Sequence, residues 1–261
     1  MGVVETDRSG GVMVIQMNRP ERLNAISAEM RRGLAAAWCE FRDAGDLEVA
    51  IFTGTGRAFC AGEDMKESLE RGAPGLDSAA LDDPYNDSTL RKPVIAAING
   101  FAMGGGFMLA ERADLRVAVP DAVFEMSEAK RWLLGGYQHG RWASLPHPIL
   151  TEMAFSYRFT AERLHQLGFI NWLAEPAELL PRAREAAEHL LSLSPATRLN
   201  TLTMTRALRP SIPDDLEALA ARLRDHGAKA DLMESRRAFA ERRAPVFRGW
   251  DDPGDRERTP Q

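Results

Sequence analysis

Short apolar runs and longer amphipathic stretches alternate along the first two thirds of the chain. Val3–Thr6 and Val12–Met17 are rich in β-branched and apolar residues, with the turn residues Ser9-Gly10-Gly11 between them. This pattern predicts a β-hairpin at the start of the chain. Ser27 stands where a helix N-cap is expected, before an alanine-rich stretch that we predict to be helical to about Arg42.

The alternation continues through the middle of the chain. Val49–Thr53 and Val94–Ile98 are continuous apolar runs, which predict strands buried on both faces. Gly104–Ala113 predicts a helix entered through glycines, and short strands are expected at Leu115–Val119 and Val123–Glu125. Strands that alternate with helices indicate an α/β fold with largely parallel pairing.

The remaining segments are predicted to be irregular or helical. Gly54–Asp64 is expected to be a loop, and Glu67–Asp87, rich in Gly, Pro, Ser and Asp, a flexible excursion. After Ser144 we expect mostly helices, with one short strand at Phe169–Leu173. The helices are expected at Ala161–Leu167, at Ala177–Leu191, from Ser194-Pro195 onward, from a cap at Asp214 or Asp215 to about His226, and at Leu232–Arg242.

Composition narrows the classes of function. The 261 residues carry a net charge of −5, which argues against a nucleic-acid-binding protein because such proteins need a basic field. Arg236-Arg237 and Arg242-Arg243 are interleaved with acids and predict a solvated helix face. No stretch of about 20 apolar residues predicts a membrane span, and no signal peptide is expected. Cys39 and Cys60 predict free thiols in a reducing compartment such as the cytoplasm, without a disulfide framework or a metal site.

Three short segments carry candidate chemistry, and each has a structural alternative. Thr53–Arg57 contains G-x-G after a predicted strand, but Phe59 occupies the third glycine position of a dinucleotide site, which favours a tight turn. Gly104–Gly106 begin a predicted helix, where N–H groups favour a developing oxyanion, although close helix–strand packing is equally consistent. Phe124–Glu128 places carboxylates among apolar residues, where a raised pKa suits proton transfer, although such an acid is often simply solvated.

The order and spacing of several motifs resemble the enoyl-CoA hydratase/isomerase (crotonase) superfamily over residues 3–247. They are Asn18-Arg19-Pro20, Leu23-Asn24-Ala25, Phe52-Thr53-Gly54, Arg57–Asp64, Lys92–Gly100, Gly104–Gly106, Leu167–Asn171 and Ser235–Arg243. The resemblance implies a spiral ββα core in residues 1–195, a helical region in residues 196–247 that builds a homotrimer or a hexamer of two trimers, and a flexible tail in residues 248–261.

The resemblance also implies an acyl-CoA thioester substrate and no separate cofactor, because coenzyme A is part of the substrate. The backbone N–H groups of Glu63 and Gly105 would hold the thioester oxygen, on which enolate charge builds. The implied substrate-binding residues are Arg22, Ala61, Glu63, Asp64, Met65, Lys66, Gly105 and Met108. Arg22 and Lys66 are candidate contacts to the phosphates of coenzyme A, or simply surface charges.

One position departs from the hydratase pattern. Hydratases of this superfamily use two glutamates, and the chain has Met108 at one of these positions and Glu128 at the other. The sequence therefore predicts an acyl-CoA lyase or isomerase, classed as an enoyl-CoA hydratase, that acts through a thioester enolate with a single Glu acid/base. The alternatives are an enoyl-CoA delta-isomerase, another specialised reaction of the superfamily, or a non-catalytic acyl-CoA-binding homologue.

Other side chains are candidates for an auxiliary role. Glu111 lies nearly on the same helix face as Met108, one turn deeper, and its alternative role is an ion pair with Arg112 or Arg116. Tyr137 and His139 lie in the loop that follows Glu128, and His titrates near neutral pH. The nearby tryptophans are expected to pack or to shape an acyl pocket; they are Trp132 and Trp142.

Overall fold

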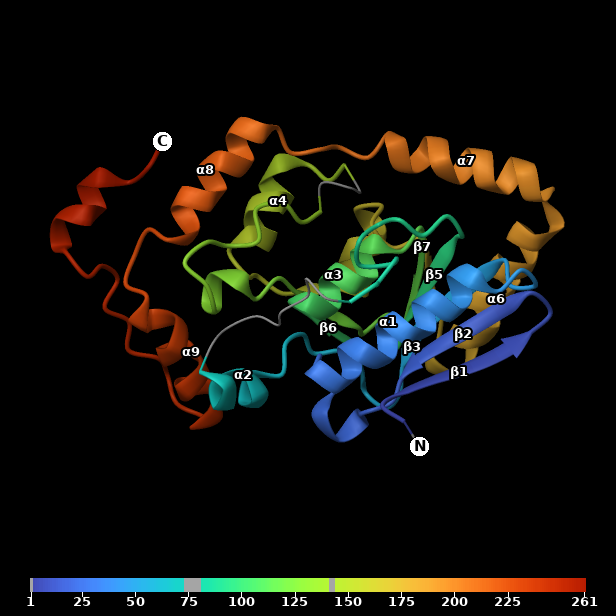
Figure 1. Cartoon of the computed structure of the whole chain (residues 1–261), viewed down its shortest axis with the longest axis horizontal. Helices are drawn as coiled ribbons and strands as arrows, with labels where there is room; N and C mark the ends of the chain where they lie inside the picture. The colour runs from blue at the N-terminus through green and yellow to red at the C-terminus, as the bar shows by residue number, and fades with distance from the viewer. Residues whose placement is uncertain (1, 73–80, 141–143) are drawn as a thin grey trace.

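The computed structural model describes residues 2–72, 81–140 and 144–261 (Figure 1). The strands are β1 (Val4–Ser9), β2 (Val12–Met17), β3 (Val49–Gly54), β4 (Ala58–Cys60), β5 (Val94–Ile98), β6 (Phe101–Met103), β7 (Leu115–Ala118), β8 (Val123–Glu125), β9 (Phe159–Thr160) and β10 (Trp172–Leu173). The helices are α1 (Ala28–Asp43), α2 (Met65–Arg71), α3 (Gly105–Arg112), α4 (His147–Ala154), α5 (Ala161–Gln166), α6 (Leu179–Ser192), α7 (Pro195–Ala207), α8 (Asp214–Arg224) and α9 (Ala230–Ala240).

The strands form two sheets that the chain visits in turn. One sheet has the order β1-β2-β3-β5-β7-β10, and the other has the order β4-β6-β8-β9. The successive pairs β3/β4, β5/β6 and β7/β8 each place one strand in the first sheet and one in the second, so the backbone winds as a spiral of ββα turns. All pairings are parallel except β1 with β2 and β8 with β9. The predicted α/β fold with largely parallel pairing is confirmed.

Burial explains why the central strands are continuously apolar. Every residue of β3 and β5 is buried, as expected for parallel strands that are covered on both faces. Helix α6 packs against β3, β5 and β7, and α1 packs against β1 and β2. The Ser27 hydroxyl accepts a hydrogen bond from the Met30 N–H, so Ser27 caps α1 as predicted.

Three local predictions were wrong. The segment predicted as the loop Gly54–Asp64 contains the short strand β4, whose residues are all buried. The predicted excursion Glu67–Asp87 begins inside α2, and residues 73–80 of it lie outside the described part of the chain. Helix α8 starts at Asp214, with Pro213 as its N-cap residue, because proline fixes the backbone dihedral that opens a helix.

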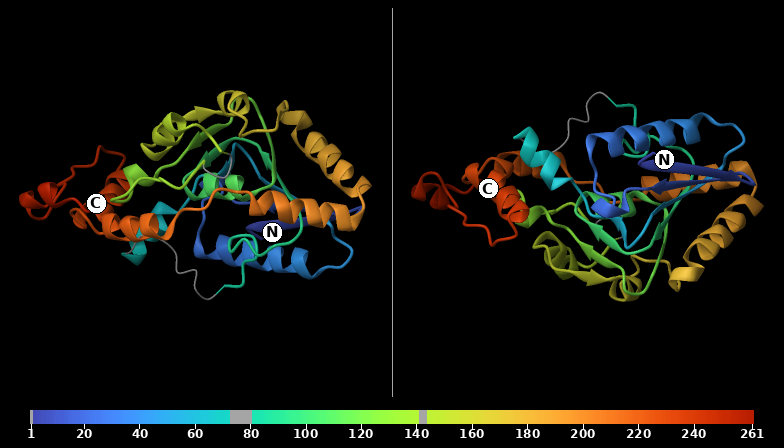
Figure 2. Two further views of the ribbon diagram at one scale, coloured as in Figure 1. Left: turned by 90° about the horizontal axis from the view of Figure 1, so that it is seen from above. Right: turned by 90° about the horizontal axis from the view of Figure 1, so that it is seen from below.

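The C-terminal helices extend the molecule at one end. Figures 1 and 2 place α8, α9 and the C-terminus there, with the β1–β2 hairpin at the other end. Helix α9 packs against α2, so a segment near residue 235 contacts a segment near residue 68. Within the described ranges, none of the helices has the length and apolar character that a membrane crossing needs.

Candidate active site

A cavity of about 440 Å³ opens between the start of α3, helix α1 and the segment that follows β8. Its apolar wall includes Ile26, Leu34, Met108, Leu109, Trp132 and Leu134. Glu63, Gly105 and Glu128 reach the same cavity, although they come from three separate parts of the sequence. A concave, mostly apolar pocket with a few convergent polar groups is the usual form of a small-molecule site.

Glycines bring two backbone segments into contact at one side of this cavity. Gly105 is the first residue of α3, and the N–H groups of a first helical turn have no acceptor within the helix. Gly62 has φ +84°, and a Cβ atom there would lie 2.6 Å from the Met103 carbonyl oxygen. A Cβ atom on Gly105 would lie 3.8 Å from the Gly62 Cα. Only glycine at position 62 allows this close approach.

A short β-bridge orients the amide of Glu63. The Ile26 N–H donates to the Gly62 carbonyl at 2.7 Å, and the Asp64 N–H donates to the Ile26 carbonyl at 3.1 Å. In a parallel bridge, the residue between these two bonds turns its own amide to the opposite side. The amides of Glu63 and Gly105 therefore belong to neighbouring segments on the rim of one cavity.

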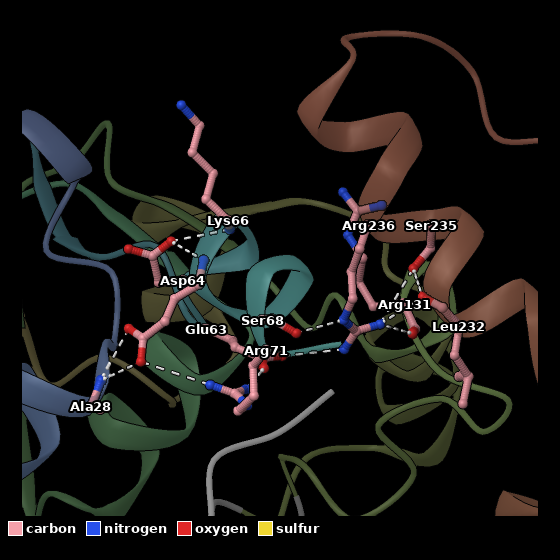
Figure 3. A network of polar contacts seen from close by, with 11 residues as sticks. Ala28, Glu63, Asp64, Lys66, Ser68, Arg71, Arg131, Leu232, Ser235 and Arg236 are labelled. Atoms are coloured by element: carbon pink, nitrogen blue, oxygen red, sulfur yellow. Dashed lines mark hydrogen bonds and ion pairs between the residues drawn. The ribbon is translucent and has the colours of Figure 1, made fainter. Parts of the chain in front are cut away.

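The side chain of Glu63 is held from the far end of the chain, as Figure 3 shows. Arg71 and Arg236 each place a guanidinium nitrogen 3.3 Å from its carboxylate. Arg236 is fully buried, and it also donates to the Ser68 hydroxyl at 2.8 Å. It also donates to the carbonyls of Arg131 and Leu232 and to the Ser235 hydroxyl. The solvated face predicted for Arg236 was therefore wrong, because α9 packs against α2.

Glu128 begins a single 3-10 turn that is separated from the end of β8 by Met126 and Ser127. Burial raises the pKa of its carboxyl group, while the nearby His139 acts in the opposite direction. Its Oε2 atom is buried and has no hydrogen-bond partner among the described residues. A Cβ atom on Gly136 would lie 3.2 Å from that oxygen, so glycine leaves room for the carboxylate. Glu128 thus has the environment predicted for a proton-transfer group.

Met108 lines the cavity, but Glu111 does not. The Glu111 carboxylate is buried, lies 2.8 Å from His139 Nδ1 and accepts a hydrogen bond from the Gly140 N–H. The alternative expectation, an ion pair of Glu111 with Arg112 or Arg116, was wrong, because the Glu111 carboxylate contacts His139 instead. Arg116 instead donates to the carbonyls of Phe169 and Ala113.

Comparison with known proteins identifies the family. The model of the family described as enoyl-CoA hydratase/isomerase matches residues 7–250. The chain belongs to this family. A carnitinyl-CoA dehydratase from Salmonella arizonae is 36% identical over 93% of this chain and 97% of its own length.

Solved structures of the family agree in fold. An enoyl-CoA hydratase from Mycobacterium tuberculosis is 34% identical, with a TM-score of 0.73 over 95% of this chain and 100% of its own. A carnitinyl-CoA hydratase from Mycobacterium avium is 26% identical, with a TM-score of 0.79 over 95% of this chain and 99% of its own. The spiral of ββα turns is therefore the crotonase fold, as the motifs predicted.

The residues predicted to contact coenzyme A lie around α2 and before α1. Lys66 is exposed and points away from the Glu63 network in Figure 3, and Arg22 is exposed in the turn Pro20–Arg22. The Asp64 carboxylate caps α2 and pairs with Arg19 at 2.7 Å, so it has a structural task in this enoyl-CoA hydratase/isomerase family member. Ala61 and Met65 flank these residues in the chain, and their contact with coenzyme A stays a prediction.

Several other predicted residues are placed as follows. The Tyr137 hydroxyl lies 3.3 Å from Glu217 and 3.1 Å from Arg224, at the edge of the cavity. Trp132 lines the cavity under the Arg236 guanidinium, and Trp142 lies outside the described residues. Burial raises the pKa of Cys60 to about 12, which makes it a packed thiol. The described residues contain no group of three or more metal-binding side chains.

Proposed function

We propose that this protein is an acyl-CoA lyase of the hydratase/dehydratase type that acts through a thioester enolate, with Glu128 as its single acid/base. One observation carries the proposal: the carboxylate of Glu128, whose Oε2 atom is buried without a hydrogen-bond partner among the described residues, shares a largely apolar cavity with Glu63 and Gly105. An acid with a raised pKa and a pair of backbone donors are the two components that enolate chemistry at a thioester requires.

The amides of Glu63 and Gly105 stabilise the negative charge on the thioester oxygen. The positive end of the α3 dipole adds to this effect at Gly105. Removing one donor from such an oxyanion hole typically costs about 2.7–4 kcal/mol of transition-state stabilisation. Coenzyme A enters as part of the substrate, so the reaction needs no further cofactor.

One carboxylate is sufficient for a balanced addition of water. The ionised Glu128 accepts a proton from a water molecule while the water oxygen bonds to the β-carbon of a 2-enoyl thioester. The electron pair of the double bond moves toward the thioester oxygen, and an enolate forms. Glu128 then returns the proton to the α-carbon, which completes the hydration. The reverse sequence is the dehydration.

Met108 favours a second candidate, the isomerisation of 3-enoyl to 2-enoyl thioesters. Its thioether stands where hydratases of the family carry a second glutamate. A thioether can neither accept nor donate a proton, so Met108 cannot take the place of that glutamate. Isomerisation needs only that Glu128 remove a proton from C2 and return it to C4 of the same substrate. The relatives are named hydratases and dehydratases, which is why water addition or removal is the first candidate.

Product analysis separates the two candidates. Purified protein is incubated with crotonyl-CoA, a 3-enoyl-CoA and carnitinyl-CoA, and products are identified by mass, since hydration adds 18 Da and isomerisation adds none. We expect hydration of 2-enoyl or dehydration of 3-hydroxyacyl substrates, with Glu128→Gln reducing kcat about 10²–10⁴-fold, the range expected for a lost acid/base.

A matched substitution controls for the loss of a carboxylate elsewhere. Glu162 is exposed in α5, and Glu162→Gln should leave kcat within a factor of two of the parent. Isomerised product without hydrated product would establish the second candidate. Binding of acyl-CoA without turnover of any substrate would establish a non-catalytic homologue and refute the proposal.

A further inference from the structure

Three titratable side chains form a continuous line behind the cavity. Glu111 Oε2 lies 2.8 Å from His139 Nδ1, and His139 Nε2 lies 3.9 Å from Glu128 Oε1. Glu111 comes from the last turn of α3, while Glu128 and His139 come from the chain after β8. The imidazole of His139 therefore stands between a carboxylate that faces the cavity and one that does not.

Two of the three side chains are buried, and the arrangement is closely packed. The exposed fractions of His139 and Glu111 are 4% and 5%. A Cβ atom on Gly136 would lie 2.8 Å from the His139 ring and 3.2 Å from Glu128 Oε2, so glycine at this position lets the imidazole and the carboxylate approach each other. Gly140 donates its N–H to the second oxygen of Glu111, which fixes the orientation of that carboxylate.

The contacts of Glu111 decide which nitrogen of His139 carries a proton. An ionised carboxylate only accepts hydrogen bonds, so Nδ1 must be the donor to Glu111. In the neutral imidazole, Nε2 then has a free electron pair directed to the Glu128 side. Nε2 and Glu128 Oε2 are both buried without a partner among the described residues. Buried polar atoms of this kind are rare unless they have a role.

We propose that His139, held by Glu111, is a positioning residue that shares a proton with Glu128 and so sets the pH range in which Glu128 is ionised. The inference rests on the proposed role of Glu128 in the reaction. When the proton moves from Glu128 to Nε2, His139 becomes an imidazolium that stabilises the ionised carboxylate. Closing the 3.9 Å gap to hydrogen-bond distance takes a shift of about 1 Å.

Other charged groups face this line from the surrounding elements. Glu125 from β8 and Glu111 from α3 both raise the pKa of Glu128. Arg116 from β7 and Arg209, which follows α7, interact with Glu111. The adjoining hollow, which Glu111 and His139 also line, brings Arg112, Glu217 and Arg224 to the other side. Among these side chains, two acids raise the pKa of Glu128 and His139 lowers it, together with a backbone hydrogen bond at Glu128 itself.

The test is the acidic limb of the pH dependence of kcat/KM. The limb reports the ionisation of Glu128 in the free enzyme. In His139→Gln the stabilisation of the carboxylate is lost, so its pKa rises, and we expect the limb to move about one pH unit toward alkaline pH. At pH values below the acidic limbs of both proteins, the kcat/KM of the variant should then be about tenfold lower than that of the parent. His147→Gln, an exposed histidine at the start of α4, is the matched control and should not move the limb.

A second measurement does not depend on turnover. The carboxyl titration of Glu128 is followed by ¹³C NMR, with Glu128→Gln identifying its resonance. A higher midpoint in His139→Gln supports the proposal even if the substrate has not been found. Two results would contradict the proposal: an unchanged titration midpoint of Glu128, or an acidic limb of kcat/KM that stays at the parent's pH while only the Tm falls. Either result would mean that His139 and Glu111 only stabilise the loop. Absence of acyl-CoA turnover in the parent would instead refute the proposed function.

Glu111 is tested through coupling. Glu111→Gln releases the imidazole from its fixed tautomer, so kcat should fall about tenfold with little change in KM. If Glu111 acts through His139, the double variant Glu111→Gln/His139→Gln should be no slower than His139→Gln alone. Multiplying effects would show that the two residues act independently and would contradict the proposal.

Discussion

The guanidinium of Arg236 lies 3.3 Å from the carboxylate of Glu63, across a sequence separation of 173 residues. Arg236 also bonds to Ser68 in α2 and to the carbonyl of Arg131, which follows the Glu128 turn. One buried side chain from α9 thus ties together the segment that presents the Glu63 amide and the segment that presents Glu128. The C-terminal helices therefore contribute directly to the geometry of the candidate site.

Arg236→Met should destabilise the protein and slow turnover. It removes the buried guanidinium from Glu63 and from the Ser68 hydroxyl, and breaking a buried ion pair typically costs about 3–5 kcal/mol. Urea unfolding measures the loss, and kcat should fall more than KM rises. Arg237→Met, on the exposed side of α9, is the control and should change stability by less than about 0.5 kcal/mol. Equal effects of the two substitutions would contradict the role assigned to Arg236 in holding the two segments together.

Gly62→Ala should abolish turnover. The new Cβ would lie 2.6 Å from the Met103 carbonyl oxygen and would force the Glu63 and Gly105 segments apart. Gly72→Ala separates this steric effect from the conformational one, because Gly72 has φ +73° with nothing within 4 Å of its Cβ position. The control should lose about 1–2 kcal/mol of stability and keep its kcat. A Gly62→Ala protein with normal kcat would refute the assignment of the two amides.

Met108→Glu should restore a second carboxylate to the cavity wall. We expect the ratio of hydrated to isomerised product to increase, because the new group orients water that Met108 cannot hold. A like charge nearby also raises the pKa of Glu128, so the acidic limb of the pH profile should move toward alkaline pH. Met108→Gln orients water without adding charge, and it should change the ratio but not the limb. An unchanged ratio in both variants would mean that Met108 does not face the reacting water.

Glu128→Gln should stabilise the fold at neutral pH. Burial raises the folded-state pKa of Glu128, so the folded protein is favoured at low pH, and this advantage is lost as pH rises from the unfolded value toward the folded one. Near pH 4 the variant and the parent should have similar free energies of unfolding. By pH 7 the variant should be more stable, by about 1.4 kcal/mol per unit of pKa difference.

Glu234→Gln should have the opposite sign in the same experiment. The hydrogen bond from Arg243 lowers the pKa of Glu234 to about 2, so its ionised form contributes stability above the unfolded pKa. The substitution should therefore weaken the fold at pH 7 and change little near pH 2. Urea unfolding curves at both pH values check the pair, and a parallel response of the two variants would contradict the assigned environments.

The sequence by itself determined the features that depend on neighbouring residues. The apolar run Val94–Ile98 has no polar face, so it had to be a strand covered on both sides. The Ser27 hydroxyl caps α1 by accepting a hydrogen bond from the Met30 N–H, three residues later, so the neighbouring residues are enough to predict this cap. The glycines around Glu63 and Gly105 mark backbone that must approach closely, and the ordered motifs of the family predict these positions and Glu128 as candidate site residues.

The tertiary structure alone decided which distant side chains meet. Nothing in the local pattern distinguishes Arg236, which is buried, from Arg237, which is exposed, because the choice depends on where α9 packs. The same holds for Glu111, whose carboxylate contacts His139 instead of an arginine. The physical reason is that burial and hydrogen-bond partners depend on packing between elements, whereas periodicity and capping report only on residues within a few positions of each other.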